Sequence, residues 1–538
     1  MLSACATMAG PPQDIAHAYA DHMIGRLANL TQDYDAAADR YFSALSRDPQ
    51  NETLLEGAVS SSLSAGDMSR ARQAVRLAPG TGAPAYVQLV RAVDDMNAQR
   101  WREANDELVR VQGSAAEELA ARLTLVWARA ALGRAEDVVA DLTPLASIRP
   151  YGALFEYQQA MAFDFAGRES EALAAYTTAA SDEMVLAPAV ERHADALVRS
   201  GARDQAIALL QRPGNASYPG LQAALARIQA NGPPLARLTP SQGAAVGLFG
   251  LATIYQQEHD SANALAALTL ALALDPQLDA ARLMFAQVQS NLDRPDAART
   301  ALAAIPATSP YSETARVLDS WLLVDLDRRD EALAAAQANA QSGSVRTRRA
   351  LADMYRELDR YADAEPIYSD LIAADPQNWR FYFARGAARA RLGRWPEAEV
   401  DLQHALTLQP EQPDVLNYLG YSWVDRGEHM EEGLQMIQRA AVLKPDSGAV
   451  IDSLGWAYYR MGDYGQAIEN LEHAVALMPA DATLNDHLGD AYWRAGRRIE
   501  ARFQWQRALS YEPEDRAAVE AKIANGLPAL PATRAAHR

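Results

Sequence analysis

Histidine is the side chain most often found at catalytic and metal sites, and the chain has nine of them among 538 residues. None lies four residues from another, which is the spacing that puts two imidazoles on one face of a helix; His17 and His22 are five residues apart. The motifs GxSxG, GxxxxGK[ST], GxGxxG and HExxH are also absent from the sequence. We therefore expect no catalytic centre, no metal site and no cofactor.

The cysteine of this chain has an informative position. Cys5 is the single cysteine, which excludes a disulfide within the chain and a thiolate metal cluster. It follows Leu2, Ser3 and Ala4, and Leu-Ser-Ala-Cys resembles a bacterial lipobox, where small residues admit a signal peptidase before a cysteine that becomes lipidated. The basic and apolar regions that precede a lipobox are missing, so we expect them upstream of Met1 or trimmed away. The alternative is a chance tetrapeptide in a cytoplasmic protein.

The charge balance limits the partners. The formal net charge is −19 and the pI is about 5.0. An acidic surface argues against nucleic acid, whose phosphates need a basic face, and against broad adsorption to anionic lipid. Membrane contact is expected only through an anchor at Cys5. The predominance of Ala, Leu, Arg, Glu and Asp favours helix.

Two consecutive segments, 448–481 and 482–515, match position for position over 34 residues each. Their shared positions are Leu454 and Leu488, Gly455 and Gly489, Tyr458 and Tyr492, Gly462 and Gly496, Ala467 and Ala501, Ala474 and Ala508, and Pro479 and Pro513. The Leu, Gly and Tyr positions fall on one face of a first helix, a glycine ends that helix, and the proline ends a second helix. The pattern predicts a helix hairpin that repeats.

This order of residues resembles the tetratricopeptide repeat. Weaker and clearer copies of the same template extend over residues 18–515, giving about 14 in all. The resemblance implies an all-α fold, a right-handed superhelical solenoid of about 14 helix-turn-helix repeats in one or two arrays.

The rhythm of the repeats suggests a division of the chain. A Pro- and Gly-rich stretch with a short helix near Leu221–Ala230 breaks the 34-residue period, and we expect a hinge there. The expected segments are a lipobox-like start and tether at 1–17, an N-terminal array at 18–211, the hinge at 212–243, a C-terminal array at 244–515, and a capping helix with a disordered tail at 516–538.

In tetratricopeptide arrays the first helix of each pair lines the concave side, where extended peptides bind. Carried onto this sequence, the inward positions of the last repeats are Asn417, Tyr421, Asp425, Asp452, Trp456, Tyr459, Asp486, Asp490, Trp493 and Arg494. Rigid aromatic side chains beside a few polar groups suit the capture of a peptide. The alternative is that Trp456 and Trp493 only fill space between neighbouring helices.

Further back, the matching positions turn basic. They are Arg346, Arg349, Arg356, Arg380 and Arg391. The Lys and Asn pattern of the carboxylate clamp in the co-chaperone branch of the family is absent, so we assign no clamp. Guanidinium groups suit bidentate hydrogen bonds to acidic residues of a partner; the alternative is a solvated face.

The last hundred residues resemble bacterial repeat proteins, many of them lipoproteins of Gram-negative envelopes, including adaptors that hold substrates for periplasmic C-terminal processing proteases. The resemblance implies a non-enzymatic scaffold that binds proteins or extended peptides and recruits an envelope protease or hydrolase to its substrates. Because Ala6 follows Cys5, we expect the periplasmic face of the outer membrane. The alternatives are a structural component of an outer-membrane export or polysaccharide secretion assembly, and a cytoplasmic scaffold.

Overall fold

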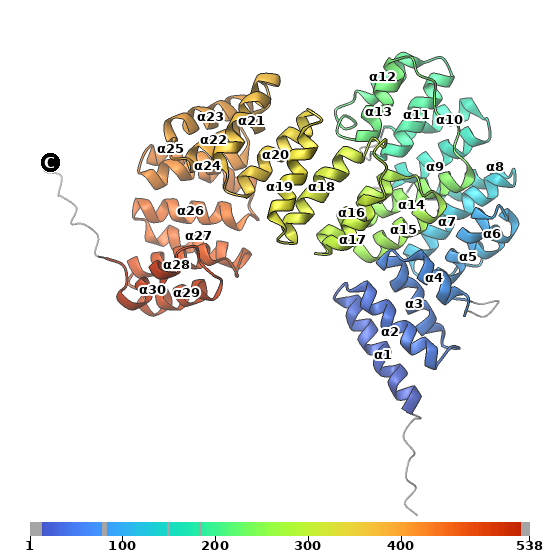
Figure 1. The fold of residues 1–538 in the computed structure, drawn as a ribbon, viewed down its shortest axis with the longest axis horizontal. Coiled ribbons are helices and arrows are strands. Elements are labelled where there is room, and N and C mark those ends of the chain that lie inside the picture. Colours follow the sequence, from blue (N-terminus) through green and yellow to red (C-terminus); the bar gives the residue numbers. More distant parts are fainter. Residues whose placement is uncertain (1–12, 78–82, 148–150, 182–184, 529–538) are drawn as a thin grey trace, which may run out of the picture. The chain divides into compact units, whose positions relative to one another are not determined.

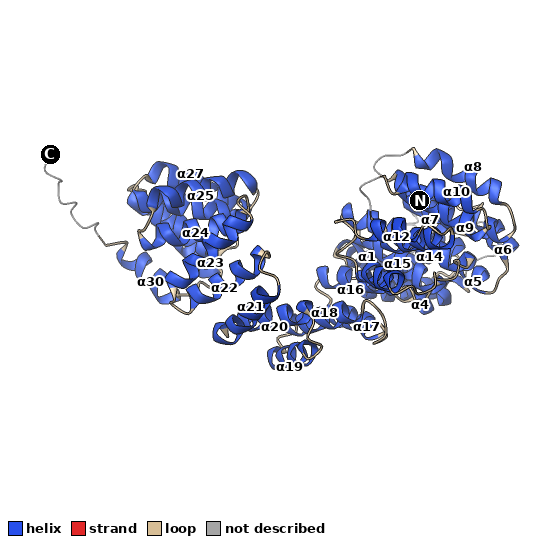
Figure 2. Ribbon diagram, turned by 90° about the horizontal axis from the view of Figure 1, so that it is seen from above, coloured by secondary structure: helices blue, strands red, loops and turns tan. Residues whose placement is uncertain are grey.

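The computed structural model describes residues 13–77, 83–147, 151–181 and 185–528. All regular structure in these ranges is helical, with 30 helices and no strand (Figure 2). In chain order the helices form 14 consecutive pairs plus α13 and α30, which confirms the predicted all-α array of helix pairs. None of the described helices is both long and apolar enough to cross a membrane. Cys5 lies outside the described residues.

The chain divides into two compact units, 1–335 and 336–538 (Figure 1). The helices that lie wholly in unit 1 are α1 (Gln13–Leu30), α2 (Tyr34–Arg47), α3 (Glu52–Ala65), α4 (Met68–Val75), α5 (Ala85–Asn97), α6 (Trp101–Leu108), α7 (Ala115–Ala131), α8 (Ala135–Ala146), α9 (Gly152–Phe165), α10 (Glu169–Ala179), α11 (Ala187–Arg199), α12 (Arg203–Leu210), α13 (Pro219–Gln229), α14 (Pro240–Gln257), α15 (Ser261–Leu274), α16 (Asp279–Asn291), α17 (Pro295–Ala303) and α18 (Ser312–Asp325). The boundary between the units falls within α19 (Arg329–Ala340).

Unit 2 holds the remaining helices. They are α20 (Val345–Glu357), α21 (Tyr361–Ala374), α22 (Trp379–Arg391), α23 (Trp395–Leu408), α24 (Pro413–Arg426), α25 (Met430–Leu443), α26 (Gly448–Met461), α27 (Tyr464–Leu477), α28 (Ala482–Arg494), α29 (Arg498–Ser510) and α30 (Arg516–Asn525). We call α20, α22, α24, α26 and α28 the first helices of unit 2, because each opens a repeat, and α21 to α29 with odd numbers the second helices.

Local sequence explains each hairpin of unit 2. Gly462 ends α26 in the left-handed conformation at φ 83°, and Asp463 then caps α27 by accepting a hydrogen bond from the backbone N–H of Gln466. Gly455 lies against the side chain of Leu471, so a Cβ at this position would collide with it. The glycine therefore sets the close approach of α26 and α27, as the repeat pattern predicts.

Unit 1 uses the same hairpin differently. Its helices α14 and α15 pack against α3, α5, α7 and α9, which are first helices of earlier repeats. Three glycines of α14 make the approach close: Gly243 lies on the indole of Trp127, Gly247 on Gln158, and Gly250 on Leu154. These four first helices of unit 1 are therefore covered by a later hairpin of the same chain.

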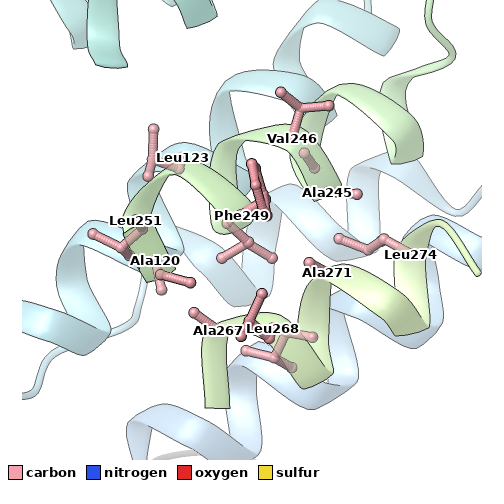
Figure 3. Close-up of a cluster of buried hydrophobic side chains, with 14 of the residues drawn as sticks. Ala120, Leu123, Ala245, Val246, Phe249, Leu251, Ala267, Leu268, Ala271 and Leu274 are labelled. Atoms are coloured by element: carbon pink, nitrogen blue, oxygen red, sulfur yellow. The ribbon is translucent and has the colours of Figure 1, made fainter. Parts of the chain in front are cut away.

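The contact between this hairpin and α7 is apolar. Figure 3 shows Phe249 and Val246 of α14 and Leu268 of α15 gathered with Ala120 and Leu123 of α7. All five residues are buried, and Phe249 is the most exposed of them at 7%. Burial of a side chain the size of Leu or Phe contributes about 1.5–3 kcal/mol. One continuous core joins these helices from α1 to α16.

Polar contacts fix the same hairpin at its edges. The Thr269 hydroxyl donates to the carbonyl of Leu63 at 2.8 Å, and the Tyr86 hydroxyl donates to Oδ1 of Asn263 at 2.9 Å. Ser64 donates to the carbonyl of Ala262 at 3.1 Å. Each bond joins residues more than 170 positions apart, so unit 1 is closed upon itself by α14 and α15.

The Pro- and Gly-rich stretch 212–243 lies inside unit 1, so the division between compact units falls at 335/336 and not at the expected hinge. Its predicted short helix is present as α13. Arg227 of α13 pairs with the buried Asp195 at 2.9 Å, and Arg237 donates to Asp164 at 3.1 Å. The proline and glycine residues of this stretch thus indicate an irregular connection and not a boundary between units. Ion pairs hold this connection against α9 and α11.

Candidate protein-binding face

The candidate site lies on α24, α26 and α28, three consecutive first helices of unit 2. Adjacent members of this row contact each other directly, while the second helices α25, α27 and α29 pack behind them. One side of each first helix is buried against its own second helix by small residues such as Gly420 and Gly489. We call the opposite surface the first-helix face of unit 2, and define it by Asn417, Tyr421, Asp425, Asp452, Trp456, Tyr459, Asp486, His487, Asp490 and Arg494.

An aromatic stack occupies the middle of this face. The rings of Trp456 and Tyr459 stack at 4.7 Å and 16°, and the indole also stacks on the imidazole of His487 at 4.1 Å and 20°. Stacked rings of this kind contribute about 0.5–1.5 kcal/mol beyond the area that they bury. Trp456 is half-buried, so it both joins α26 to α28 and contributes to the surface. The two expectations for this residue, guest contact and space filling, are compatible.

Toward α24, the stack continues into a polar rim. The indole N–H of Trp456 lies 3.5 Å from Oδ1 of Asp425, which also accepts a bond of 2.7 Å from Arg460. Tyr421 is half-buried, and burial together with the carboxylates of Asp425 and Asp452 raises its pKa to about 12. The hydroxyl of Tyr421 is therefore protonated at neutral pH and can donate a hydrogen bond.

An ionic cluster lies on the other side of the stack. Nδ1 of His487 lies 3.0 Å from both carboxylate oxygens of Asp452. Burial favours the neutral imidazole, but the carboxylates of Asp452, Asp486 and Asp490 outweigh it and raise the pKa of His487. The carboxylates thus extend the pH range of the imidazolium form, and the ring itself stacks on Trp456.

The capping helix supplies the second cation of this cluster. Lys522 of α30 donates to Asp486 at 2.6 Å and to Asp490 at 2.9 Å, and the indole N–H of the fully buried Trp505 donates to Asp490 at 2.9 Å. Burial raises the pKa of Asp490, and Lys522 opposes that shift. Asp486 and Asp490 therefore stabilise the packing of α30 against α28. Their carboxylates form most of their hydrogen bonds within the chain.

Trp493 faces the end of the chain and not an open surface. Its ring lies 5.4 Å from that of Trp505, and the guanidinium of Arg498 stacks over it at 3.8 Å. A Cβ on Gly526, which has φ 71°, would collide with the Trp493 indole. Of the predicted aromatic strip, Tyr421, Trp456 and Tyr459 thus remain for contact with a guest, while the chain's own C-terminal segment covers Trp493.

Asn417 is a further polar position on α24, one turn before Tyr421. Its side-chain oxygen is buried and has no hydrogen-bond partner among the described residues. A buried carbonyl without a donor is unfavourable by about 1–3 kcal/mol. A rotation of the amide toward the surface would expose this oxygen to a donor.

The predicted basic residues are mostly used within unit 2. Arg349 and Arg356 both lie near Asp353, at 3.3 and 3.7 Å. Arg391 lies 3.8 Å from Asp359 and stacks on Tyr361, and Arg380 stacks over Trp379 at 4.8 Å. Arg346 is exposed on α20 and also takes part in an interaction within the chain. These residues form separate pairs along α20 and α22, and their use by a partner stays a prediction.

Sequence reasoning missed His487, a member of the face, and Lys522, which binds Asp486 and Asp490 of the face from α30. A lone histidine and a lysine on a capping helix carry no motif of their own. The spacing offers one signal, because His487 follows Asp452 by 35 residues, close to one repeat, and neighbouring repeats place such positions side by side. Among the described residues, no group of three or more His, Cys, Asp or Glu side chains is arranged to hold a metal ion.

Unit 1 has a cleft of about 610 Å³ between the turn after α3 and helices α15 to α17. Its lining is mainly apolar, with Phe285 and Leu272 among the larger side chains. Its two arginines are bonded within the chain, Arg72 to Asp94 at 2.8 Å and Arg282 to the carbonyl of Pro276 at 2.6 Å. The cleft offers little unpaired polarity, so the first-helix face of unit 2 is the stronger candidate.

Comparison with known proteins agrees with the helix pairs of the fold. Residues 255–318 and 349–413 match the family described as Tetratricopeptide repeat, and residues 455–496 match one described as TPR repeat. A TPR repeat-containing protein of Pseudomonas aeruginosa is 30% identical over 92 residues, which cover 17% of this chain and 16% of that relative.

Solved structures are similar at lower identity. A tetratricopeptide repeat protein from Parabacteroides merdae is 15% identical, with a TM-score of 0.38, over 45% of this chain and 96% of its own. The Cut9–Hcn1 complex matches over 95% of this chain and 97% of its own, at 15% identity and a TM-score of 0.43. The family matches, together with the helix pairs, show that the chain contains tetratricopeptide repeats.

Proposed function

We propose that the chain is a non-enzymatic adaptor that binds extended segments of other proteins on the first-helix face of unit 2. Tetratricopeptide repeats typically form non-catalytic scaffolds that bind proteins or peptides. The difference between the units supports the choice of face, since α14 and α15 cover α3, α5, α7 and α9 in unit 1. In unit 2, the corresponding surface carries half-buried aromatic rings and the partly exposed carboxylate of Asp425.

The observation that carries the proposal is the half-buried ring of Tyr421 on α24, one turn after Asn417. An extended peptide presents a backbone donor and acceptor at each residue, so it can accept a hydrogen bond from the Tyr421 hydroxyl, and Asn417 can join this contact once its amide turns toward the surface. The rings of Tyr421, Trp456 and Tyr459 then supply apolar contact. Aromatic anchors beside a few polar groups are the usual composition of interface hot spots.

Replacement of Asn417 and Tyr421 by alanine together tests this proposal. We expect the partner that co-purifies with the wild-type chain from envelope fractions to be lost, since the double variant removes an anchor and a hydrogen-bond position. Phe503→Ala is the matched control, because Phe503 is an apolar side chain 58% exposed on the second helix α29. The proposal fails if the double variant keeps its partner at wild-type yield, and Phe503→Ala should keep the partner in either case. A thermal melt of each variant separates lost binding from lost folding.

We further propose that the adaptor is a lipoprotein on the periplasmic face of the outer membrane, where it recruits an envelope protease or hydrolase to its substrates. The support is the Leu-Ser-Ala-Cys sequence at Cys5 and the resemblance of the last repeats to envelope adaptors. The natural gene with its upstream sequence, expressed with a labelled fatty acid, should yield a labelled chain, and Cys5→Ser should abolish the label. An unlabelled wild-type chain in the soluble fraction would favour the cytoplasmic alternative.

A further inference from the structure

The chain does not leave unit 2 at the end of its last helix. After α30, residues Gly526–Pro528 lie on α28 rather than extending into solvent. Gly526 contacts the Trp493 indole directly, which a side chain at this position would prevent. The carbonyl of Pro528 accepts a hydrogen bond of 2.7 Å from Nη1 of Arg494. Three residues outside any helix are thus held on a first helix by an aromatic ring and by a bond to their backbone.

This contact is continuous with the aromatic stack. Arg494 also approaches the Tyr459 hydroxyl through its Nε, at 3.4 Å, and Tyr459 stacks on Trp456. One side chain, Arg494, therefore joins the last described residue of the chain to the middle of the first-helix face. The interactions at Gly526–Pro528 are of the kind proposed above for a guest, a ring beneath the backbone and a hydrogen bond to a peptide group.

The remaining residues suit the same surface in charge. Residues 529–538 include Arg534 and Arg538 and no acidic residue, while 336–528 carry 29 Asp and Glu against 21 Lys and Arg. On the face itself, the carboxylate of Asp425 is 50% exposed. Its pair with Arg460 lies at the surface, where one exposed ion pair is worth at most about 1 kcal/mol, so an incoming arginine can compete for it.

The remaining residues also suit the surface in length and backbone. Ten residues in extended form span up to about 33–36 Å, and neighbouring packed helices are about 8–10 Å apart. A segment that starts at Pro528 on α28 can therefore reach α26 and α24. Each of the prolines Pro528 and Pro531 has a fixed φ, which lowers the conformational entropy that the segment can lose on binding.

We propose that residues 529–538 continue along the first-helix face of unit 2 and occupy it in the same molecule, and that partner segments compete with them. The proposed guest class is accordingly an extended segment that contains proline and arginine. This second statement rests on the proposed function, whereas occupation by the chain's own tail does not.

A synthetic peptide of residues 527–538 tests the proposal against two forms of the chain. The full-length protein and a variant that ends at Pro528 are titrated with the labelled peptide, and anisotropy is measured. The shortened variant keeps every contact described above. A tethered tail has an effective concentration of about 1 mM, so for a dissociation constant on the order of 0.1 mM we expect the full-length chain to bind about tenfold more weakly. Equal affinity for both forms, or no binding to either, would overturn occupation by the tail.

A full-length variant gives an independent measurement. Arg534→Glu with Arg538→Glu should weaken the hold of the tail and bring the affinity of the full-length chain for the wild-type peptide close to that of the shortened one. A peptide with the same two changes should bind neither form. If the double variant still resists the peptide as strongly as wild type, the charge argument is wrong.

The outcomes separate the two proposals. If the tail peptide fails to bind while Asn417→Ala with Tyr421→Ala still abolishes partner capture, the proposed function stands and occupation by the tail is rejected. If the peptide binds the shortened chain and the same double variant keeps its partner, the tail is a ligand of this face but the partner binds elsewhere.

Discussion

Unit 1 and unit 2 use the same helix hairpin, yet the surfaces of their first helices differ in how far they are buried. In unit 1, the apolar hairpin of α14 and α15 covers α3, α5, α7 and α9, and Trp127 is completely buried beneath Gly243. In unit 2, the corresponding surface holds half-buried rings and a cluster of charged groups. The comparison teaches that the repeat supplies a surface, and that the residues of one later hairpin decide whether that surface becomes core or stays available.

The largest effect should come from the covered surface of unit 1. Trp127→Ala removes a fully buried indole and the donor that reaches Oε1 of Gln158 at 2.8 Å, so we expect a loss of about 3–5 kcal/mol in the stability of unit 1. Calorimetry should show a lower unfolding temperature for one transition and an unchanged second one. A loss below about 1 kcal/mol would mean that α14 does not seal this face in solution.

A smaller effect is expected at the open surface of unit 2. Trp456→Ala should weaken partner binding by about 2 kcal/mol, which is roughly 30-fold, because the indole is the central ring of the face. Phe503→Ala on the outer side should leave the affinity unchanged. If Trp456→Ala melts unit 2 and leaves partner affinity intact, the ring is core, and the two units differ less than we infer.

A pH dependence of stability is expected in unit 2 from His487. The raised pKa of His487 means that its protonation stabilises the folded state, fully below the unfolded value of about 6.5, and that this contribution is lost as the pH rises through the folded pKa. The pKa of Asp490 is also raised, so ionisation of this carboxyl lowers the stability of the folded state as the pH rises above about 3.8. Urea unfolding at several pH values above 6 should show a fall that His487→Gln reduces. A variant with the wild-type slope would place the titration elsewhere.

The smallest effect is expected at the basic positions. Arg391→Ala removes an exposed pair with Asp359 at 3.8 Å, and should change stability by at most about 1 kcal/mol. Its effect on partner binding at low and high salt decides whether the arginines of α20 and α22 contact an acidic guest. A salt-dependent loss of affinity would extend the binding surface toward these helices.

Much of the fold was predictable because residues close in sequence specify the helix hairpin of each repeat. The 34-residue period, the glycine at Gly462 and the small residue at Gly455 each specify a backbone feature of one hairpin, and each prediction is confirmed. First-helix positions such as Tyr421 and Trp456 follow from the same period. What the period cannot specify is contact between distant repeats.

The covering of unit 1 was not predicted for that reason. Ala252, Tyr255, Ala264 and Ala271 mark α14 and α15 as an ordinary repeat, so the template assigns them an ordinary place. A second signal was present, since 244–274 is apolar on nearly all sides, and a helix of that kind is buried all round. The ionic cluster of His487 and Lys522 was not predicted for a similar reason, because it forms only where α30 packs against α28.

The hydrogen bond from Thr269 to Leu63 spans 206 positions, and this has a consequence for synthesis on the ribosome. The first repeats of unit 1 leave the ribosome with exposed apolar surfaces. The helices that bury these surfaces, α14 and α15, are complete only after residue 274 has been translated. Native closure of unit 1 must therefore wait for a large loop to form, which slows folding and prolongs exposure to aggregation. Unit 2, whose repeats contact mainly their neighbours, can assemble one hairpin at a time.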